Sequence, residues 1–196
     1  GGNGDSSGGE IDLSSQIKEN SNEINIMKTR EINVLSFGAK GDGVTDDTEA
    51  IVNAITYANS TSREQQIAVF FPKGKYVISH KIKVPNNTTL RIKGENQRSC
   101  IIQPSVNYTD NCLFELDSNS KSIDIAKIAF SDEGAVNAKS ITAIEFISGS
   151  HGMMRVEDVN CYSLRYFIRG GGSSEFPLGG SFKNIYCYGN YTGGIY

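Results

Sequence analysis

Two glutamates hold matching places in two similar apolar runs, Glu115 in LFEL and Glu145 in AIEF. Neighbouring residues of a strand point to opposite faces of a sheet, so the apolar neighbours would point inward and both carboxylates outward. If the two runs pair as adjacent strands, the carboxylates lie roughly 5 Å apart, near the separation that retaining glycosidases use. The pattern predicts a catalytic carboxylate pair. Charged residues on the solvated face of a sheet are common, and this alternative stays open.

Aromatic residues gather in the last third of the chain, among them Tyr162, Phe167 and Tyr188. An aromatic ring offers an apolar face and, in tyrosine, a polar edge, which together suit the face of a sugar ring. We therefore predict that these three side chains contact carbohydrate. The alternative is that they pack in the core, where aromatic side chains bury a large apolar area.

The segment FGAKGDGVTDDTEAI, residues 37–51, concentrates glycine and aspartate before an apolar stretch. A phosphate-binding loop needs Lys and Ser or Thr directly after its last glycine, whereas Val44 follows Gly43. A calcium loop needs spaced carboxylates that end in a bidentate glutamate, and the spacing here does not reproduce that series. Asp46 stands three residues before Glu49, the spacing of a capping box, so the segment predicts the start of a helix. The predicted structural cap consists of Asp46, Asp47 and Thr48.

The composition bears on the classes of partner. The chain has 38% hydrophobic residues, 21% charged residues and a formal net charge of -3, without a basic block, so nothing favours nucleic acid or an anionic membrane surface. No apolar run approaches the roughly 18 residues of a membrane span, and we predict no membrane insertion. The four cysteines lack the paired short spacing of a zinc site, so we predict no metal, no cofactor and free thiols, with a disulfide as the alternative.

The elements that must position these residues follow from a repeat. Three segments align without gaps: SIDIAKIAFSD from Ser122, MMRVEDVNCYS from Met153 and GSFKNIYCYGN from Gly180. Their apolar columns join Ile125, Val156 and Phe182, then Ile128, Val159 and Ile185, then Phe130, Cys161 and Cys187. In each segment the alternation of apolar and other residues breaks once, at Ala126-Lys127, Glu157-Asp158 and Lys183-Asn184. There an extra residue must turn a corner between two strands. A second strand-like run precedes each segment. A repeat of strands with no helix implies stacked coils, and the sequence predicts an all-β fold, a parallel β-helix.

The chain divides into three parts. Residues 1–10 have no side chains able to offset the cost of ordering and indicate a flexible linker or tag remnant. Residues 11–30 predict a helix with the four-three spacing of a short coiled-coil seam, which needs partner chains; a lone amphipathic helix is the alternative. The seam consists of Leu13, Ile17, Asn20, Ile24 and Met27. Residues 31–196 predict the N-terminal part of a β-helix that continues in a longer protein, since the final YTGGIY resembles the opening of another coil.

Three stretches carry a resemblance to a known family: INVLSFGAKGDGVTDDTEAIVNAI, then VFFPKGKYVIS, then IKVPNNTTLRIKGE, which together cover about residues 32–95. In their order and spacing they resemble the pectate-lyase-like (pectin lyase-fold) superfamily, and within it the N-terminal region shared by phage tail spikes, phage appendage proteins and related extracellular polysaccharide enzymes. The resemblance implies a right-handed parallel β-helix whose first coil is covered by an N-terminal capping α-helix.

The same resemblance implies a function. We expect a component of a phage tail spike or appendage, located in the virion, that binds a polysaccharide of the host cell surface and could depolymerise it. Such a protein would form a homotrimer and attach through its N-terminus to phage tail or baseplate proteins. Two alternatives are a secreted polysaccharide lyase or glycoside hydrolase that acts on pectin-like polymers, and a structural trimeric shaft without catalysis.

Overall fold

A computed structural model of the protein describes residues 13–61, 67–84, 88–116, 122–133, 135, 140–147, 152–170 and 180–189. The elements are α1 (Leu13–Thr29), β1 (Glu31–Asn33), the 3-10 helix η1 (Val34–Phe37), β2 (Asp42–Asp46), α2 (Thr48–Thr61), β3 (Ala68–Phe71), β4 (Gly74–Ile78), β5 (Ile82–Val84), β6 (Thr89–Gly94), β7 (Cys100–Pro104), β8 (Cys112–Leu116), β9 (Ser122–Ser131), β10 (Thr142–Phe146), β11 (Met153–Tyr162), β12 (Tyr166–Gly170) and β13 (Gly180–Tyr188). The expectations for residues 1–10 and for the final YTGGIY lie outside the described residues.

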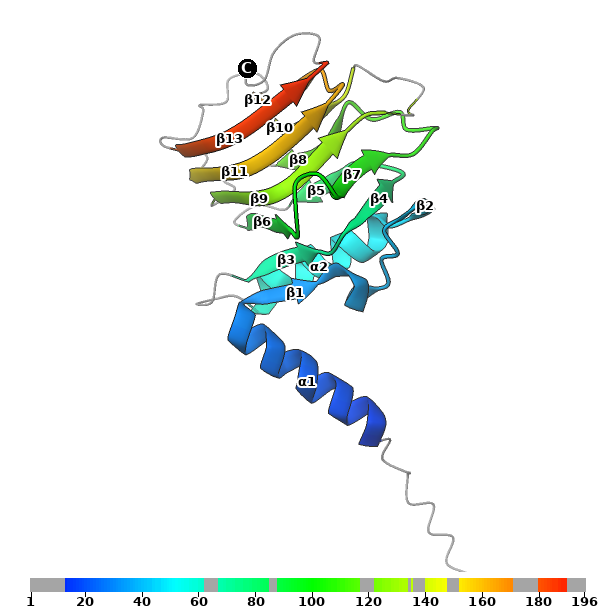
Figure 1. Ribbon diagram of the computed structural model, residues 1–196, viewed down its shortest axis with the longest axis vertical. Coiled ribbons are helices and arrows are strands. Elements are labelled where there is room, and N and C mark those ends of the chain that lie inside the picture. Colours follow the sequence, from blue (N-terminus) through cyan, green and yellow to red (C-terminus); the bar gives the residue numbers. More distant parts are fainter. Residues whose placement is uncertain are drawn as a thin grey trace, which may run out of the picture.

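The strands form two sheets in which the described neighbours run parallel. One sheet has nine strands, from β1 and β2 at one end to β13 at the other, and the second has four, in the order β12-β10-β8-β5. Figure 1 shows the strands stacked from β1 upward to β13, with α2 beside the first coils and α1 projecting away from the stack. The chain therefore winds as a parallel β-helix, and this prediction is confirmed.

The register of β9, β11 and β13 is the one that the sequence repeat predicted. The observed columns join Ile125 to Val156 and Phe182, Ile128 to Val159 and Ile185, and Phe130 to Cys161 and Cys187. Strand β9 pairs with β6 through its first half and with β7 through its second half, so two separate strands of one coil become one longer strand in the next. Parallel stacking of this kind satisfies the backbone polar groups of each inner coil with those of its neighbours.

The predicted corners are visible in the backbone. Lys127, Asp158 and Asn184 have φ values of 54°, 55° and 53°, in the left-handed region that non-glycine residues rarely adopt. The Asn184 side chain donates a hydrogen bond of 2.8 Å from Nδ2 to Oδ1 of Asp158 on the neighbouring coil. The extra residue in each segment therefore turns the chain, as predicted, and two of these residues also link their coils.

The core runs along the interior of the coils. The ring of Phe130 lies 6.1 Å from that of Phe114 and 6.0 Å from that of Phe167, measured between centroids, and all three side chains are fully buried. The four cysteines are free thiols, as the sequence predicted, and three of them are buried. Burial raises the pKa of the Cys112 and Cys161 thiols, which leaves both in the neutral form.

Helix α2 covers the first coils. Its residues Ile51, Ala54, Ile55 and Ala58 recur at helical spacing and are buried, and the helix contacts η1, β1 and β3. This apolar stripe closes the N-terminal end of the interior, where the first coil would otherwise expose its inward side chains to water. The capping α-helix that the sequence predicted is observed.

Helix α1 leaves its seam uncovered. Leu13, Ile17 and Ile24 are 67%, 64% and 52% exposed, while the Met27 side chain lies outside the described residues. None of the described helices is long and apolar enough to cross a membrane.

Candidate functional site

The two glutamates stand side by side on the four-stranded sheet. Glu115 of β8 pairs in register with Glu145 of β10, and the column continues to Lys83 of β5 on one side and Arg169 of β12 on the other. Adjacent strands lie about 4.8 Å apart, so the predicted proximity of the two residues is observed. We call these four residues the charged column; its charges run positive, negative, negative, positive.

Both carboxylates are largely buried and engaged by cations. Glu115 receives a short hydrogen bond from the Lys81 ammonium group and lies 3.8 Å from Nζ of Lys83, and its side chain is only 12% exposed. The bond to Glu115 is the main cause that raises the pKa of Lys81, and partial burial opposes it. The backbone N–H of Lys81 donates to Asp110 at 2.8 Å, which fixes the lysine beside the column.

Glu145 is held in the same way from the other side. Its Oε1 lies 3.4 Å from Nη1 of Arg169, and its Oε2 accepts a hydrogen bond of 2.5 Å from Nδ2 of Asn111. The pKa of the Cys112 thiol is raised mainly by burial and, to a smaller extent, by the charge of Glu145. A retaining glycosidase needs one carboxyl group that donates a proton and a second that is free to attack, whereas here each carboxylate already accepts contacts from its neighbours. The catalytic role of the pair stays a prediction.

Two of the three predicted carbohydrate contacts lie together on another face. Tyr162 of β11 and Tyr188 of β13 are register neighbours, with ring centroids 5.6 Å apart and planes inclined by 14°. Tyr188 is 53% exposed, so part of the stack faces solvent. Asn160, which the sequence reasoning missed, donates from Nδ2 to the Tyr162 hydroxyl at 2.9 Å and to the Gln97 carbonyl at 3.2 Å. These bonds fix the Tyr162 hydroxyl and leave the stack preformed.

The third predicted contact, Phe167, is not on this surface. Its side chain is fully buried beside Phe130, so it cannot contact a glycan, and that prediction is wrong. In β12 the residues Tyr166, Phe167 and Ile168 are all buried, which breaks the alternation of inward and outward side chains. Phe167 therefore turns into the core at the place where period-two reasoning puts an outward residue.

A groove that the sequence did not predict lies along the same register column of the large sheet as Tyr162. It is a cavity of about 250 Å³ with Gln103 and Glu133 among its lining residues and with exposed Val44 and Val106 at its rim. Ser131, in register with Tyr162, lies between the groove and the stack and accepts a hydrogen bond from the backbone of Glu133. The full lining is Gly43, Val44, Val77, Gln103, Pro104, Ser105, Val106 and Glu133.

The predicted cap residues lie at the start of α2 and serve the backbone. Asp46 accepts the N–H of Thr48 at 3.0 Å through Oδ1, and the carbonyl of Asp47 accepts the first helical bond, from Ile51, at 3.0 Å. The Asp47 carboxylate points the other way and accepts the N–H groups of Lys40 at 2.6 Å and Gly41 at 3.1 Å. Burial raises the pKa of Asp47 despite these bonds. Asp46 thus stands one residue before the position that a capping box would give it.

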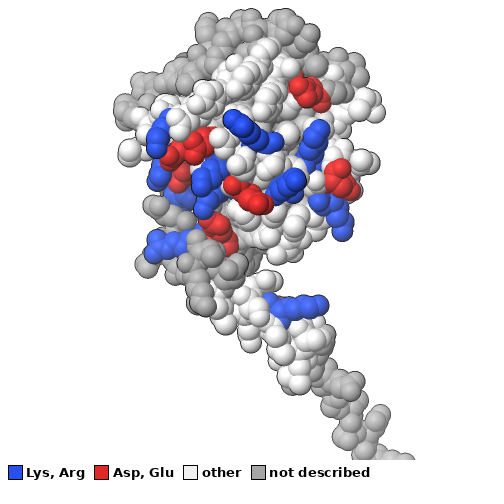
Figure 2. All heavy atoms as spheres, viewed as in Figure 1, with Lys and Arg blue, Asp and Glu red and all other residues white. Residues whose placement is uncertain are grey.

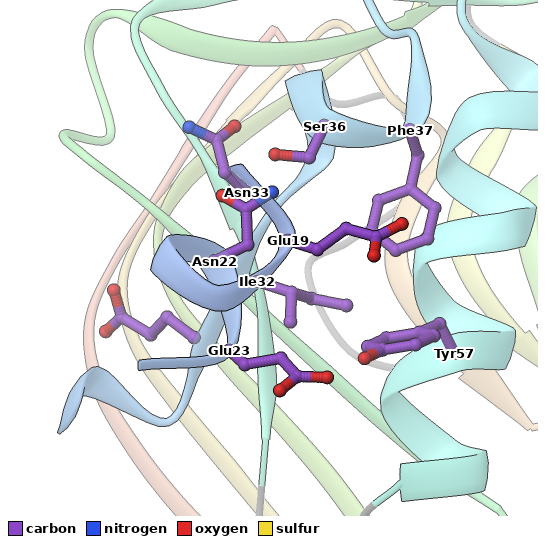
Figure 3. A pocket seen from close by; sticks show the side chains of 9 residues that line it. Glu19, Asn22, Glu23, Ile32, Asn33, Ser36, Phe37 and Tyr57 are labelled. Carbon is purple, nitrogen blue, oxygen red and sulfur yellow. The ribbon is translucent and has the colours of Figure 1, made fainter. Parts of the chain in front are cut away.

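A second cavity lies between α1 and the first coil, and we call it the α1 cleft. Its volume is about 420 Å³. Figure 3 shows side chains from α1 on one side of it and Ile32, Phe37 and Tyr57 from the body of the protein on the other. The lining consists of Glu19, Asn22, Glu23, Glu31, Ile32, Asn33, Ser36, Phe37 and Tyr57.

Charges on the face of the large sheet are interspersed rather than segregated. Figure 2 shows Lys and Arg side chains next to Asp and Glu across this face. Nε of Arg91 lies 3.5 Å from Oδ2 of Asp124, and Nζ of Lys183 lies 2.9 Å from Oε1 of Glu157. Cations and anions of neighbouring strands therefore offset each other. Within the described residues no group of three or more His, Cys, Asp or Glu side chains could hold a metal ion.

The chain matches a family model described as "Rhamnogalacturonase A/epimerase, pectate lyase-like" over residues 31–157. The preneck appendage protein of Bacillus phage PZA is 30% identical over 177 residues, which cover 77% of this chain and 19% of that protein. The capsule K30/K69-specific depolymerase of Klebsiella phage K64-1 is 30% identical over 113 residues, which cover 58% of this chain and 14% of the depolymerase.

Two solved structures have a similar fold. ORF18 of Geobacillus virus E2 matches with a TM-score of 0.58 and 27% identity, over 79% of this chain and 31% of that chain. The pre-mature gene product 12 of bacteriophage phi29 matches with a TM-score of 0.63 and 19% identity, over 93% of this chain and 25% of that chain. The chain spans about a fifth of the length of the curated phage relatives.

Proposed function

We propose that this chain, which belongs to the rhamnogalacturonase A/epimerase, pectate lyase-like family, works in a phage appendage. We also propose that it binds a polysaccharide of the host cell surface. Relatives that match most of the chain are the preneck appendage protein of phage PZA and the pre-neck appendage protein of phage phi29. A further relative is a capsule-specific depolymerase. The virion is accordingly the proposed location, as the sequence led us to expect.

The observation that carries polysaccharide binding is the stacked pair of Tyr162 and Tyr188. Aromatic side chains are costly to leave exposed, yet Tyr188 is exposed, and it stacks on Tyr162, which is half-buried on the neighbouring coil. Their spacing repeats with the coils, and the groove beside Gln103 and Glu133 supplies amide and carboxylate groups that can bond sugar hydroxyls. A preformed aromatic surface with a few polar groups next to it is the usual composition of a carbohydrate site.

The test compares tyrosines that differ in place. We expect Tyr162→Ala and Tyr188→Ala, each alone, to reduce binding of the protein to intact host cells or to their purified surface polysaccharide about tenfold or more, in line with the loss of one aromatic anchor. Tyr57→Ala removes a partly exposed tyrosine from α2 and serves as the matched control. Equal binding by wild-type protein and both stack variants would contradict the proposed site.

Cleavage of the polysaccharide is the second candidate function, and it rests on the register of Glu115 and Glu145. Glu115→Gln with Glu145→Gln keeps the shape of both side chains and removes their chemistry. If the pair is catalytic, the double variant releases no reducing or unsaturated sugar ends from a polymer that the wild-type protein cleaves. If release continues at the wild-type rate, the pair has no catalytic role. Binding without any release would support recognition alone.

Trimer formation is proposed from α1. Its apolar seam of Leu13, Ile17 and Ile24 faces solvent in the single chain, and burial of such a seam between parallel helices would remove it from water. Light scattering of the wild type and of an Ile17→Lys/Ile24→Lys variant checks this: we expect three copies for the first and one for the second. A trimer that binds no glycan at all would favour the structural shaft. A wild-type monomer that cleaves pectin-like polymers would favour the secreted enzyme.

The two ends of the molecule have different proposed partners. Helix α1 projects from the end where the first coil begins, and the tyrosine stack lies on β11 and β13 at the far end (Figure 1). An appendage must attach to the virion at one end and meet the host with the other. We therefore assign attachment to the phage tail or baseplate to the α1 end and host recognition to the later coils.

A further inference from the structure

We propose that the α1 cleft receives an arginine side chain of the phage protein to which the appendage attaches. The inference rests on the proposed attachment through the α1 end and names the chemistry of the contact. It follows from three features of the cleft: an aromatic floor, two carboxylates from α1 that point into it, and a helix face that the proposed trimer does not use.

The floor of the cleft is apolar. Ile32 is buried, and the rings of Phe37 and Tyr57 lie 5.5 Å apart between centroids at an angle of 55°. Tyr57 is 38% exposed, so one ring of the pair is open to a ligand. The cavity volume of about 420 Å³ lies within the range of sites that hold a ligand, and it is larger than a single side chain needs.

The α1 wall of the cleft is acidic. Figure 3 shows Glu19 and Glu23 extending from the helix into the space before Phe37 and Tyr57. A third acid, Glu31, already pairs with Lys93. No ion pair joins Glu19 or Glu23 to a cation among the described residues. The face of an aromatic ring carries negative potential, so carboxylates and rings together form an environment that repels anions and attracts a cation from both sides.

Arginine fits this environment better than lysine. Its planar guanidinium can stack on an aromatic ring and at the same time donate paired hydrogen bonds to a carboxylate, whereas an ammonium group acts as a point charge. Its aliphatic stem can lie along Ile32. Asn22, on the same wall, offers a further acceptor for the remaining donors.

A second copy of the chain is not the proposed occupant of the cleft, because in the proposed trimer the α1 helices contact each other through the seam. The seam residues Leu13, Ile17 and Ile24 do not line the cleft, while Glu19 and Glu23 do. On a helix with 3.6 residues per turn, Glu19 and Asn22 lie roughly 120° and 180° from the centre of the seam, whereas Glu23 flanks the seam at about 80°. Trimer formation along the seam would therefore leave the wall at Glu19 and Asn22 open to a different protein.

The test uses the whole chain of 196 residues and two synthetic peptides, acetyl-Gly-Ala-Arg-Ala-Gly-amide and the same peptide with neutral citrulline in place of arginine. Two-dimensional NMR follows the backbone signals of Glu19 and Asn22 and the ring signals of Tyr57. We expect the arginine peptide to shift these signals and the citrulline peptide to leave them in place. In Glu19→Gln/Glu23→Gln the dissociation constant should rise about tenfold, since two charge-assisted contacts are lost.

The control variant is Glu49→Gln, which removes one carboxylate from an exposed side chain outside the cleft, where the cleft variant removes two. It should bind the arginine peptide as the wild type does. The inference is overturned if the peptide leaves the Tyr57 signals unchanged, if both peptides bind equally, or if the cleft variant binds as well as the wild type. It is also overturned if the ring signals of Tyr57 shift with protein concentration alone, because a second copy then fills the cleft. Polysaccharide binding at Tyr188, measured on the same samples, reports the proposed function separately.

Discussion

Gly94 tests the stacking of coils most directly, because it lies where two coils approach each other at a corner. It ends β6, directly after Lys93, which pairs with Ala126, so it faces the turning residue Lys127 of the next coil. A Cβ atom added at Gly94 would lie 2.1 Å from the backbone oxygen of Lys127 and 3.1 Å from Cβ of Cys100. Gly94 does not have a positive φ, so the effect of an added methyl group is purely steric.

The magnitude follows from this overlap. Ordinary van der Waals contact begins at 3.4 Å, so the Cβ atom and the Lys127 oxygen must separate by about 1.3 Å, and the oxygen belongs to the backbone of a paired strand. Overpacking in a core costs about 1–3 kcal/mol, and a clash with backbone belongs at the upper end. For Gly94→Ala we therefore expect the free energy of unfolding to fall by about 3 kcal/mol. In a domain of this size such a change lowers Tm by about 6–12 °C, which thermal unfolding followed by circular dichroism measures directly.

Gly180→Ala is the matched control. Its added Cβ would lie 2.9 Å from Cε2 of Phe182, the end of a side chain that is 43% exposed and can move aside. We expect a loss of less than about 1 kcal/mol for it. If Gly94→Ala unfolds at the wild-type temperature, or if both variants lose the same stability, the close approach of coils at Lys127 is not a constraint and the reasoning from the stacked corners fails.

Three further predictions concern stability. Asp46→Ala should lose about 1 kcal/mol at pH 7, the contribution of a hydrogen bond such as the one it accepts from the Thr48 N–H. Burial alone would raise the pKa of Asp46, but hydrogen bonds from Ser79 and Thr48 lower it. The contribution is therefore present above pH 3.8 and disappears as pH falls through the lower native pKa, where urea unfolding should show the two proteins converging. Glu115→Gln should lower the free energy of unfolding at pH 7, and this loss should shrink above pH 10.5, because the contribution linked to the raised pKa of Lys81 vanishes as pH rises through the native value. Phe130→Ala should cost about 3–5 kcal/mol in urea unfolding at pH 7, since its ring fills the core between two others, and a loss below 1 kcal/mol would contradict that packing.

The interior columns could be predicted from the sequence because stacking imposes a strict condition. Each inward residue of one coil must meet a similar residue of the next, so three aligned segments are enough to identify the columns. The same alignment located the corners, since one extra residue between two alternating runs has to leave the strand. Lys127, Asp158 and Asn184 indeed adopt the left-handed conformation. What is repeated along the chain could therefore be read without a structure.

Other features could not be predicted from the aligned repeat: departures from strict alternation, and contacts between segments far apart in the sequence. Phe167 was expected outside, but β12 buries three consecutive residues, and β8 and β10 bury Leu113 and Ala143 at the matching position. The groove beside Gln103 joins Val44 of β2 and Val106 of a turn, which are far apart in the sequence. The contacts of Glu145 with Asn111 and Arg169 also come from two different coils. The groove and the Asn111 contact need the relative placement of segments that are not repeated. The burial at Phe167 does recur from coil to coil, and strict alternation of inward and outward residues failed to predict it.

Stacking also explains the charged column without reference to catalysis. Two carboxylates about 5 Å apart repel by about 3 kcal/mol at an effective dielectric constant of about 20. Lys83 and Arg169, one strand beyond on either side, and Lys81 offset this repulsion, so the column needs its cations as soon as Glu115 and Glu145 become neighbours. The stacking of Tyr162 on Tyr188 offsets no such repulsion, because both side chains are uncharged in this stack. We therefore propose Tyr162 and Tyr188, before the two glutamates, as the residues that recognise a ligand.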